Sequence, residues 1–180
     1  IIDEMITLMR RWWAGESITE QWRGLSFGDV ALEPRPMQEP LEVWLGGIST
    51  VALERVATLG DGWLTSAATP AEAGAGRATI ERRAEELGRV VDVDHFGISI
   101  PFCIEEPQET ALSGLRQRRK DRDLTNIVAV GTDDLQRLTK AHIDSGLSKF
   151  VVRPLDTYST NAAWRDDLLW LADAALPLQT

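Results

Sequence analysis

The sequence predicts an α/β fold, because short apolar runs alternate with longer amphipathic runs over most of the chain. The apolar runs occupy residues 41–45, 62–65, 96–104 and 149–153, and a helical pattern follows each of them. Such alternation is typical of parallel strands joined by crossover helices. The runs contain little polar alternation, which indicates strands buried on both faces. We therefore expect a parallel sheet covered by helices.

The length of the repeat favours one parallel architecture over another. Residues 1–180 have the size of a single domain. Within them, residues 41–180 hold four strand–helix units of about 35 residues each, and a complete eight-unit barrel uses about 250 residues. We therefore expect half of a TIM barrel. An open doubly wound sheet also holds four or five strands, but its first strand usually lies near the amino end.

The first 40 residues precede this repeat and differ from it. Over residues 1–13, apolar side chains recur every three or four positions, and Gly15 follows where a left-handed helix cap would stand. Residues 17–40 are irregular, punctuated by glycines, and contain the proline-rich sequence EPRP. We expect a helix followed by an extended excursion that includes a short hairpin. Because the helical pattern is already established at Ile1, we expect further chain upstream.

The helices after residue 40 have recognisable ends. They are expected over residues 49–60, 69–88, 106–118, 132–146 and 164–175, with a short strand-like insert over residues 126–130. Ser49, Thr69 and Thr132 stand where an N-cap would, and Pro70 occupies a first helical position. Gly60 and Gly88 stand where two of these helices stop.

Composition excludes several classes of protein. The hydrophobic fraction of 43% and the charged fraction of 26% are those of a globular chain, which excludes disorder. The net charge of −9 repels nucleic acid and anionic lipid, so neither is an expected partner. One cysteine forms neither an internal disulfide nor a thiolate cluster, and no apolar run reaches the length of a membrane span. With no secretion signal visible, we expect a soluble, cytoplasmic protein.

The sequence VWLGGIS at residues 43–49 is the sharpest local feature. It predicts a strand that turns through Gly46 and Gly47 into a helix. Without β-carbons there, a phosphate can approach the amides at the helix start, where the helix dipole also favours an anion. The hydroxyl of Ser49 either caps the helix or donates to that phosphate. A tight turn with close helix packing explains the two glycines equally well.

Polar residues at the ends of two other strands are candidate ligands of a substrate or anion. Thr65 and Ser66 lie at the carboxyl end of the second strand, and barrel sites form at the carboxyl ends of strands. Arg153 ends the fourth strand, where its charge needs a partner. A bound anion or Asp156 would serve. Asp61 is expected to be a turn residue with no ligand role.

The remaining candidates are expected to be structural. His142 lies on an apolar helix stripe, His95 in an acidic turn, and Cys103 in a buried strand. Neither histidine has companions at metal-ligand spacing, so no metal site is expected. The basic cluster over residues 116–122 is diluted by aspartate and is expected to be a solvated helix end. No residue is assigned a catalytic role.

Several segments together resemble the bacterial luciferase-like oxidoreductases. They read LEPRPMQEP at residues 32–40, VWLGGIS at residues 43–49 and ALERVATLGDGW at residues 52–63. Later, VGTDD at residues 130–134 and FVVRP at residues 150–154 resemble the closing part of the family. The family includes FMN monooxygenases and enzymes that depend on the deazaflavin coenzyme F420.

This resemblance implies a TIM barrel of the luciferase-like type, of which the chain supplies about strands five to eight. It implies that the cofactor phosphate binds at one loop, formed by Leu45, Gly46, Gly47, Ile48 and Ser49. The residues that surround the cofactor ring in the family lie on strands one to four, which have no counterpart here. Because a half-barrel exposes sheet edges, a second copy of the chain or a separate amino-terminal half is expected to cover them.

The activity that the resemblance implies is hydride exchange between a small organic substrate and coenzyme F420. Thr65 and Arg153 would then lie near the mouth of the barrel. An FMN-dependent monooxygenase is the near alternative, and a noncatalytic, cofactor-binding fragment is the alternative from another class. A sugar-phosphate barrel enzyme would need a lysine or a carboxylate pair at the strand ends, and the four strands offer none.

Overall fold

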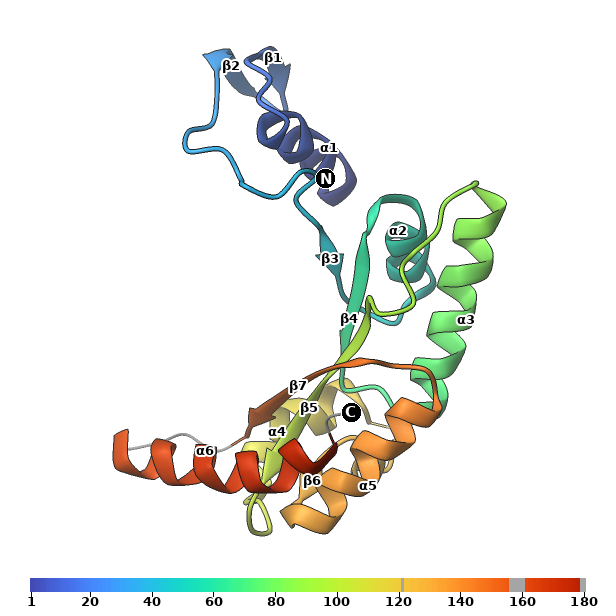
Figure 1. Cartoon of the computed structure of the whole chain (residues 1–180), viewed down its shortest axis with the longest axis vertical. Helices are drawn as coiled ribbons and strands as arrows, with labels where there is room; N and C mark the ends of the chain where they lie inside the picture. The colour runs from blue at the N-terminus through green and yellow to red at the C-terminus, as the bar shows by residue number, and fades with distance from the viewer. Residues whose placement is uncertain (121, 156–160, 179–180) are drawn as a thin grey trace.

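The computed structural model describes residues 1–120, 122–155 and 161–178 (Figure 1). In chain order the elements are α1 (Ile2–Trp13), β1 (Ile18–Trp22), β2 (Leu25–Val30), β3 (Trp44–Leu45), α2 (Thr50–Leu59), β4 (Gly62–Ser66), α3 (Pro70–Glu86), β5 (Phe96–Cys103), α4 (Glu109–Arg118), η1 (Leu124–Asn126), β6 (Ala129–Val130), α5 (Gly131–Asp144), β7 (Lys149–Pro154), α6 (Asn161–Ala175) and η2 (Leu176–Leu178). Over these residues, no helix is long and apolar enough to cross a membrane.

Consecutive main strands of the sheet are spatial neighbours. β3 pairs with β4, β4 with β5 and β5 with β7, all in parallel. The short β6 pairs with Phe102 and Cys103 at the end of β5, beyond the reach of β4. A doubly wound sheet reverses its strand order at a switch point, whereas a barrel wall does not. The predicted α/β class with a parallel sheet is therefore confirmed, and its strand order is that of a barrel wall.

The first strand of this sheet is shorter than the sequence predicts. We expected residues 41–45, but β3 contains only Trp44 and Leu45. Asp61 gives the reason: its carboxylate accepts a hydrogen bond from the Val43 amide at 2.8 Å, and its own amide donates to the Val43 carbonyl at 2.9 Å. The chain before Trp44 is thus held by a turn residue instead of a strand ladder.

Helices α2, α3, α5 and α6 pack on one face of the sheet. The side chains that this face contributes to the core are nearly inaccessible to solvent; on the strands they are Trp63, Phe96, Ile98, Ile100 and Phe102. The indole of Trp63 reaches α3, where a β-carbon at Gly76 would lie 2.6 Å from its ring. The ring of Phe102 stacks on Trp170 of α6 at 5.5 Å. This helix-covered face holds the main core.

The opposite face of the sheet is covered unevenly. The strand register places Leu64, Ser99, Val151 and Arg153 on it. β5 is buried on both faces, as predicted, but β7 alternates between half-buried and exposed positions. The exposed fraction of Val151 is 46%. The prediction that all strands are buried on both faces is therefore wrong for β7, because no element among the described residues packs over Val151.

Helix α4 lies at the carboxyl ends of the strands and forms a small core of its own. This second cluster consists of Leu112, Leu115, Leu124, Ile127 and Val128. The loop after β4 and the end of β7 pack against it through Ala67 and Leu155. Figure 1 shows α4, in yellow, beside β5 and β7. The helix therefore covers part of the edge at which barrel enzymes build their sites.

The amino-terminal helix and hairpin are confirmed. α1 ends in a Schellman motif: the Gly15 amide donates to the Trp12 carbonyl and the Glu16 amide to the Arg11 carbonyl, with Gly15 at φ +84°. β1 and β2 pair antiparallel within the predicted excursion. Figure 1 shows this segment at the opposite end of the molecule from α5 and α6. An ion pair of 2.6 Å between Arg10 and Asp61 joins it to the sheet.

Two of the three predicted helix caps are confirmed. The hydroxyl of Ser49 accepts a hydrogen bond from the Ala52 amide, and Thr69 forms a reciprocal capping box with Glu72. The predicted cap at Thr132 is wrong, because α5 begins at Gly131, directly after β6. There the carboxylate of Asp134 accepts a hydrogen bond from the Val130 amide at 3.1 Å.

Candidate functional site

The loop between β3 and α2 passes very close to its neighbours. A β-carbon at Gly46 would lie 2.9 Å from the Leu64 carbonyl oxygen, and one at Gly47 would lie 2.9 Å from the Ala52 β-carbon. Gly47 also has φ +98°, which side chains strongly disfavour. Close packing therefore requires glycine at both positions. Gly46, Gly47 and Ser49 are nevertheless exposed, so the backbone of the loop is open to an incoming group.

One buried tryptophan fixes how the peptide groups of this loop are turned. The indole Nε1 of Trp63 donates a hydrogen bond of 2.9 Å to the Gly47 carbonyl. In a trans peptide the carbonyl and the following N–H point in opposite directions. Because the Gly47 carbonyl is turned inward to Trp63, the Ile48 amide is turned away from the core. Nothing in the sequence around Trp63 reveals this role, because the partner lies 16 positions away.

The donors of the loop have no partner inside the described part of the chain. The amides of Gly47, Ile48 and Ser49 make no hydrogen bond to any described residue. The Ser49 oxygen accepts from the Ala52 amide at 3.3 Å, which leaves its hydroxyl hydrogen available to donate. The two roles predicted for Ser49, cap and phosphate donor, are therefore compatible.

The start of α2 also carries no negative charge. The first turns of α1, α3, α4 and α5 each contain at least one acidic residue, whereas the first turns of α2 and α6 contain none. Its dipole and unpaired amides therefore remain available to an external anion. Leu45 and Ile48 pack against the main core and anchor the two sides of the loop. The five predicted residues thus form a cradle that fits a phosphate group.

Thr65 and Arg153 do not come together. Thr65 pairs with Ile98 in the register, is 1% exposed, and faces the helices. Its hydroxyl oxygen has no hydrogen-bond partner in the described structure. Arg153 pairs with Pro101 and lies on the opposite face, exposed to solvent. Asp156, one of its two predicted partners, lies outside the described residues.

Arg153 lines a cavity of about 430 Å³ between α4 and the carboxyl ends of the strands. The polar side chains around it are Ser66, Ser99, Arg118 and Arg153. Ser66 is exposed, as expected for a residue at the carboxyl end of β4. Neither the cavity nor the place of Arg118 in it could be predicted, because nothing local in the sequence shows that α4 folds over the strand ends.

The basic cluster at the end of α4 differs from its prediction. Arg119 and Arg122 both form ion pairs with Glu72, at the start of α3. Burial raises the pKa of Glu72, but the Thr69 amide and the Arg119 guanidinium outweigh that effect and lower it. The side chain of Arg119 is only 14% exposed, so the expected solvated helix end is wrong there. The spacing from Thr69 to Glu72 is that of a capping box and indicates where the Glu72 carboxylate lies, but no sequence signal indicates that Arg119 and Arg122 pair with it.

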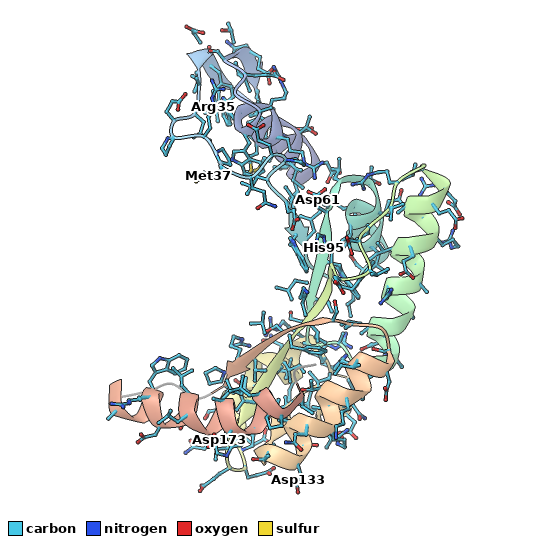
Figure 2. The ribbon with its side chains drawn as sticks, viewed as in Figure 1. Arg35, Met37, Asp61, His95, Asp133 and Asp173 are labelled. Atoms are coloured by element: carbon cyan, nitrogen blue, oxygen red, sulfur yellow. The ribbon has the colours of Figure 1, made fainter. Side chains whose placement is uncertain are left out.

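The residues expected to be structural are placed accordingly. The Nδ1 atom of His95 lies 2.8 Å from the Asp61 carbonyl oxygen, and its ring lies against Trp44. Figure 2 shows Asp61 and His95 close together where the amino-terminal segment meets the sheet. His142 is 1% exposed, and burial lowers its pKa to about 4. Cys103 is buried in β5.

Comparison with known proteins agrees with this fold. A model of the luciferase-like monooxygenase family matches residues 1–149. A solved F420-dependent secondary alcohol dehydrogenase, in complex with an F420–acetone adduct, matches with a TM-score of 0.74 and 12% identity over 98% of this chain and 61% of its own. The coenzyme F420-dependent tetrahydromethanopterin reductase of Methanopyrus kandleri matches with a TM-score of 0.70 and 13% identity, over 99% of this chain and 63% of its own.

A third solved structure carries a different cofactor. The oxygenating constituent of 3,6-diketocamphane monooxygenase from Pseudomonas putida, in complex with FMN, matches with a TM-score of 0.67 and 15% identity, over 97% of this chain and 62% of its own. The chain therefore spans about three fifths of the length of these structures. At such low identities the likeness shows the fold. The family match, which covers most of the chain, shows more: this protein belongs to the luciferase-like monooxygenase family.

Proposed function

We propose that the chain is the carboxyl-terminal part of a luciferase-like oxidoreductase and that the loop at residues 45–49 binds the phosphate of its flavin-type cofactor. One observation carries this proposal. The unpaired amides of Gly47, Ile48 and Ser49 lie at a helix start that has no acidic residue in its first turn. This arrangement binds anions in proteins generally.

We propose coenzyme F420 as the cofactor, with FMN as the alternative. Sequence resemblance favours F420-dependent members, and two of the similar structures are named as F420-dependent enzymes. When bound, the deazaflavin supplies hydride transfer to or from an organic substrate. The part of this chain is to hold the phosphate at Ile48 and Ser49 and so to fix the position of the cofactor. FMN stays the alternative because the third similar structure binds it.

We also propose that the chain supplies half of a barrel. Two features support this: the strand order is that of a barrel wall, and one face of β7 is exposed at Val151. A second copy of the chain or an amino-terminal half-barrel would cover that face and the edges of β3 and β7. Sedimentation velocity tests this directly. We expect self-association of the 180-residue chain, and a monodisperse monomer would contradict it.

Two substitutions of Ser49 test the phosphate site. Aspartate and asparagine are similar in shape and are both strong N-caps, so each keeps α2 capped in place of the serine. They differ by one negative charge at the position where the phosphate is proposed to bind. At about 4 Å two unit charges repel by about 1–4 kcal/mol at a protein surface. We therefore expect Ser49→Asp to bind coenzyme F420 at least about fivefold more weakly than Ser49→Asn.

The readout is coenzyme fluorescence, with circular dichroism to confirm that both variants are folded. Equal affinities of Ser49→Asp and Ser49→Asn would refute the phosphate site. Cofactor binding alone does not separate the noncatalytic alternative from part of an enzyme, because both are expected to bind. A turnover assay after addition of a separately produced amino-terminal half-barrel of the family does: turnover is expected only if the chain is part of an enzyme.

A further inference from the structure

The wall of the cavity under α4 carries two positively charged side chains, Arg118 and Arg153. Its lining is Ser66, Ala67, Ser99, Pro101, Ala111, Gly114, Leu115, Arg118, Arg153 and Leu155. No acidic side chain is among these described lining residues. The volume, about 430 Å³, is within the range of pockets that hold small organic molecules.

The two arginines of this cavity, Arg118 and Arg153, are not neutralised by any residue that the structure describes. On the same helix, Arg116 pairs with Glu109, and beyond its end Arg122 pairs with Glu72. Arg118 and Arg153 have no carboxylate within 4.0 Å in the described part of the chain. Arg118 donates only to the Gly114 carbonyl of its own helix, at 3.2 Å. Two guanidinium groups in one cavity without a carboxylate favour an anionic occupant.

The rest of the cavity suits the same kind of occupant. Ser66 and Ser99 lie on the sheet face that Arg153 shares, and their hydroxyls make no hydrogen bond to another described residue. Leu115, next to Arg118 in the lining, is anchored in the second core cluster. The ion pairs of Arg119 and Arg122 with Glu72 hold the end of α4 in place. The wall that carries Arg118 is therefore fixed, which lowers the entropic cost of binding.

The cavity and the phosphate loop occupy different places along the sheet. The loop follows β3, whereas the cavity is built on the ends of β4, β5 and β7. Both lie at the carboxyl edge, where the ligands of barrel enzymes bind. A molecule that bridged them would lie across the mouth of the barrel.

We propose that Arg118 and Arg153 bind an anionic group of the organic substrate, a carboxylate or a phosphate monoester, with Ser66 and Ser99 as hydroxyl donors. This inference rests on the proposed function, since it assigns the cavity to the substrate of the same enzyme. The remaining source of an anion with this chemistry is the distal part of the cofactor. The experiment below distinguishes the two.

Site-resolved NMR with inorganic phosphate as the probe tests the cavity. In ¹H–¹⁵N spectra of the 180-residue chain, we expect saturable shifts at the Ser99 amide and at the Arg153 side-chain Nε–H. Arg153→Gln and Arg118→Gln should each weaken the binding seen at Ser99 by about tenfold, because each removes a charge-assisted hydrogen-bond donor. Arg82→Gln, which removes the same charge from an exposed helix position, is the control and should leave it unchanged.

Each outcome supports or overturns the inference. Shifts at Ser99 that are absent, or that are equal in Arg153→Gln, Arg118→Gln and Arg82→Gln, would overturn it. A second titration adds coenzyme F420 or FMN to the phosphate-saturated chain: if either cofactor displaces phosphate from Ser99, the cavity binds the cofactor and the substrate assignment is wrong. Failure of the proposed function has a separate readout. It would appear as equal cofactor affinities of Ser49→Asp and Ser49→Asn, and neither substitution is expected to alter the phosphate shifts at Ser99.

Discussion

The buried imidazole of His142 predicts a loss of stability in acid that can be worked out in advance. Its side chain is 1% exposed, and its Nδ1 atom has no hydrogen-bond partner in the described structure. Burial lowers its pKa from 6.5 to about 4. Above pH 6.5 the imidazole is neutral in both folded and unfolded states and costs nothing. As the pH falls from about 6.5 to about 4, the unfolded chain takes up a proton that the folded chain does not, so folding becomes less favourable.

The size of the effect follows from the two pKa values. The pKa values of the unfolded and folded states differ by about 2.5. This difference corresponds to a loss of about 3 kcal/mol of unfolding free energy once the imidazole is protonated in both states. Domains of this kind have total stabilities of about 5–15 kcal/mol, so the loss is measurable. Most of this loss should be present at pH 4.5.

Urea unfolding followed by tryptophan fluorescence at pH 7.5 and pH 4.5 measures this loss. Carboxylates also titrate in this range, so the comparison is with His142→Leu, which keeps an apolar side chain on the α5 stripe and removes the titration. We expect wild type to lose about 2–3 kcal/mol more than His142→Leu between the two pH values. Equal losses in the two proteins would show that His142 is protonated as easily in the folded state as in the unfolded state.

Three further substitutions test the packing that supports the site. Asp61→Ala removes the carboxylate that pairs with Arg10 and accepts a hydrogen bond from the Val43 amide. Urea unfolding should therefore show a loss of about 1–3 kcal/mol in unfolding free energy; an unchanged midpoint would contradict the role of Asp61 in joining the amino-terminal segment to the sheet. Gly76→Ala places a β-carbon 2.6 Å from the Trp63 ring, so thermal unfolding should occur at a lower temperature, and full stability would mean that α3 shifts freely. Glu72→Gln weakens the ion pairs that hold the end of α4, and limited proteolysis should then cut near α4 faster than in wild type; equal cleavage rates would show that the pairs do not restrain it.

Local signals in the sequence predicted the main elements well. Ser49 and Thr69 are caps, and Gly15 takes the left-handed conformation that ends α1. These features depend on neighbouring residues alone, so a pattern within a few positions is enough to predict them. The cradle at residues 45–49 was predicted for the same reason. A strand, two glycines and a capped helix follow each other directly in the chain.

Features that depend on distant partners could not be predicted in this way. Trp63 turns the Gly47 carbonyl inward from 16 positions away, and Arg119 meets Glu72 across 47 positions. The exposure of Val151 depends on which elements cover the second face of the sheet, which strand patterns do not reveal. Thr65 was predicted as a candidate ligand because it lies at a strand end, but the face of the sheet to which its side chain points depends on the register with β5. Pairing register and packing of α4 are tertiary properties, and they decide the shape of the cavity.

Parallel fluorescence titrations of the folded 180-residue chain with oxidised coenzyme F420 and with FMN test the central claim most directly. The account predicts saturable binding, with coenzyme F420 bound more tightly than FMN, because residues of this chain alone hold the phosphate donors of the β3–α2 loop in place. A folded chain that binds neither cofactor would contradict the claim that this loop is a preformed phosphate site.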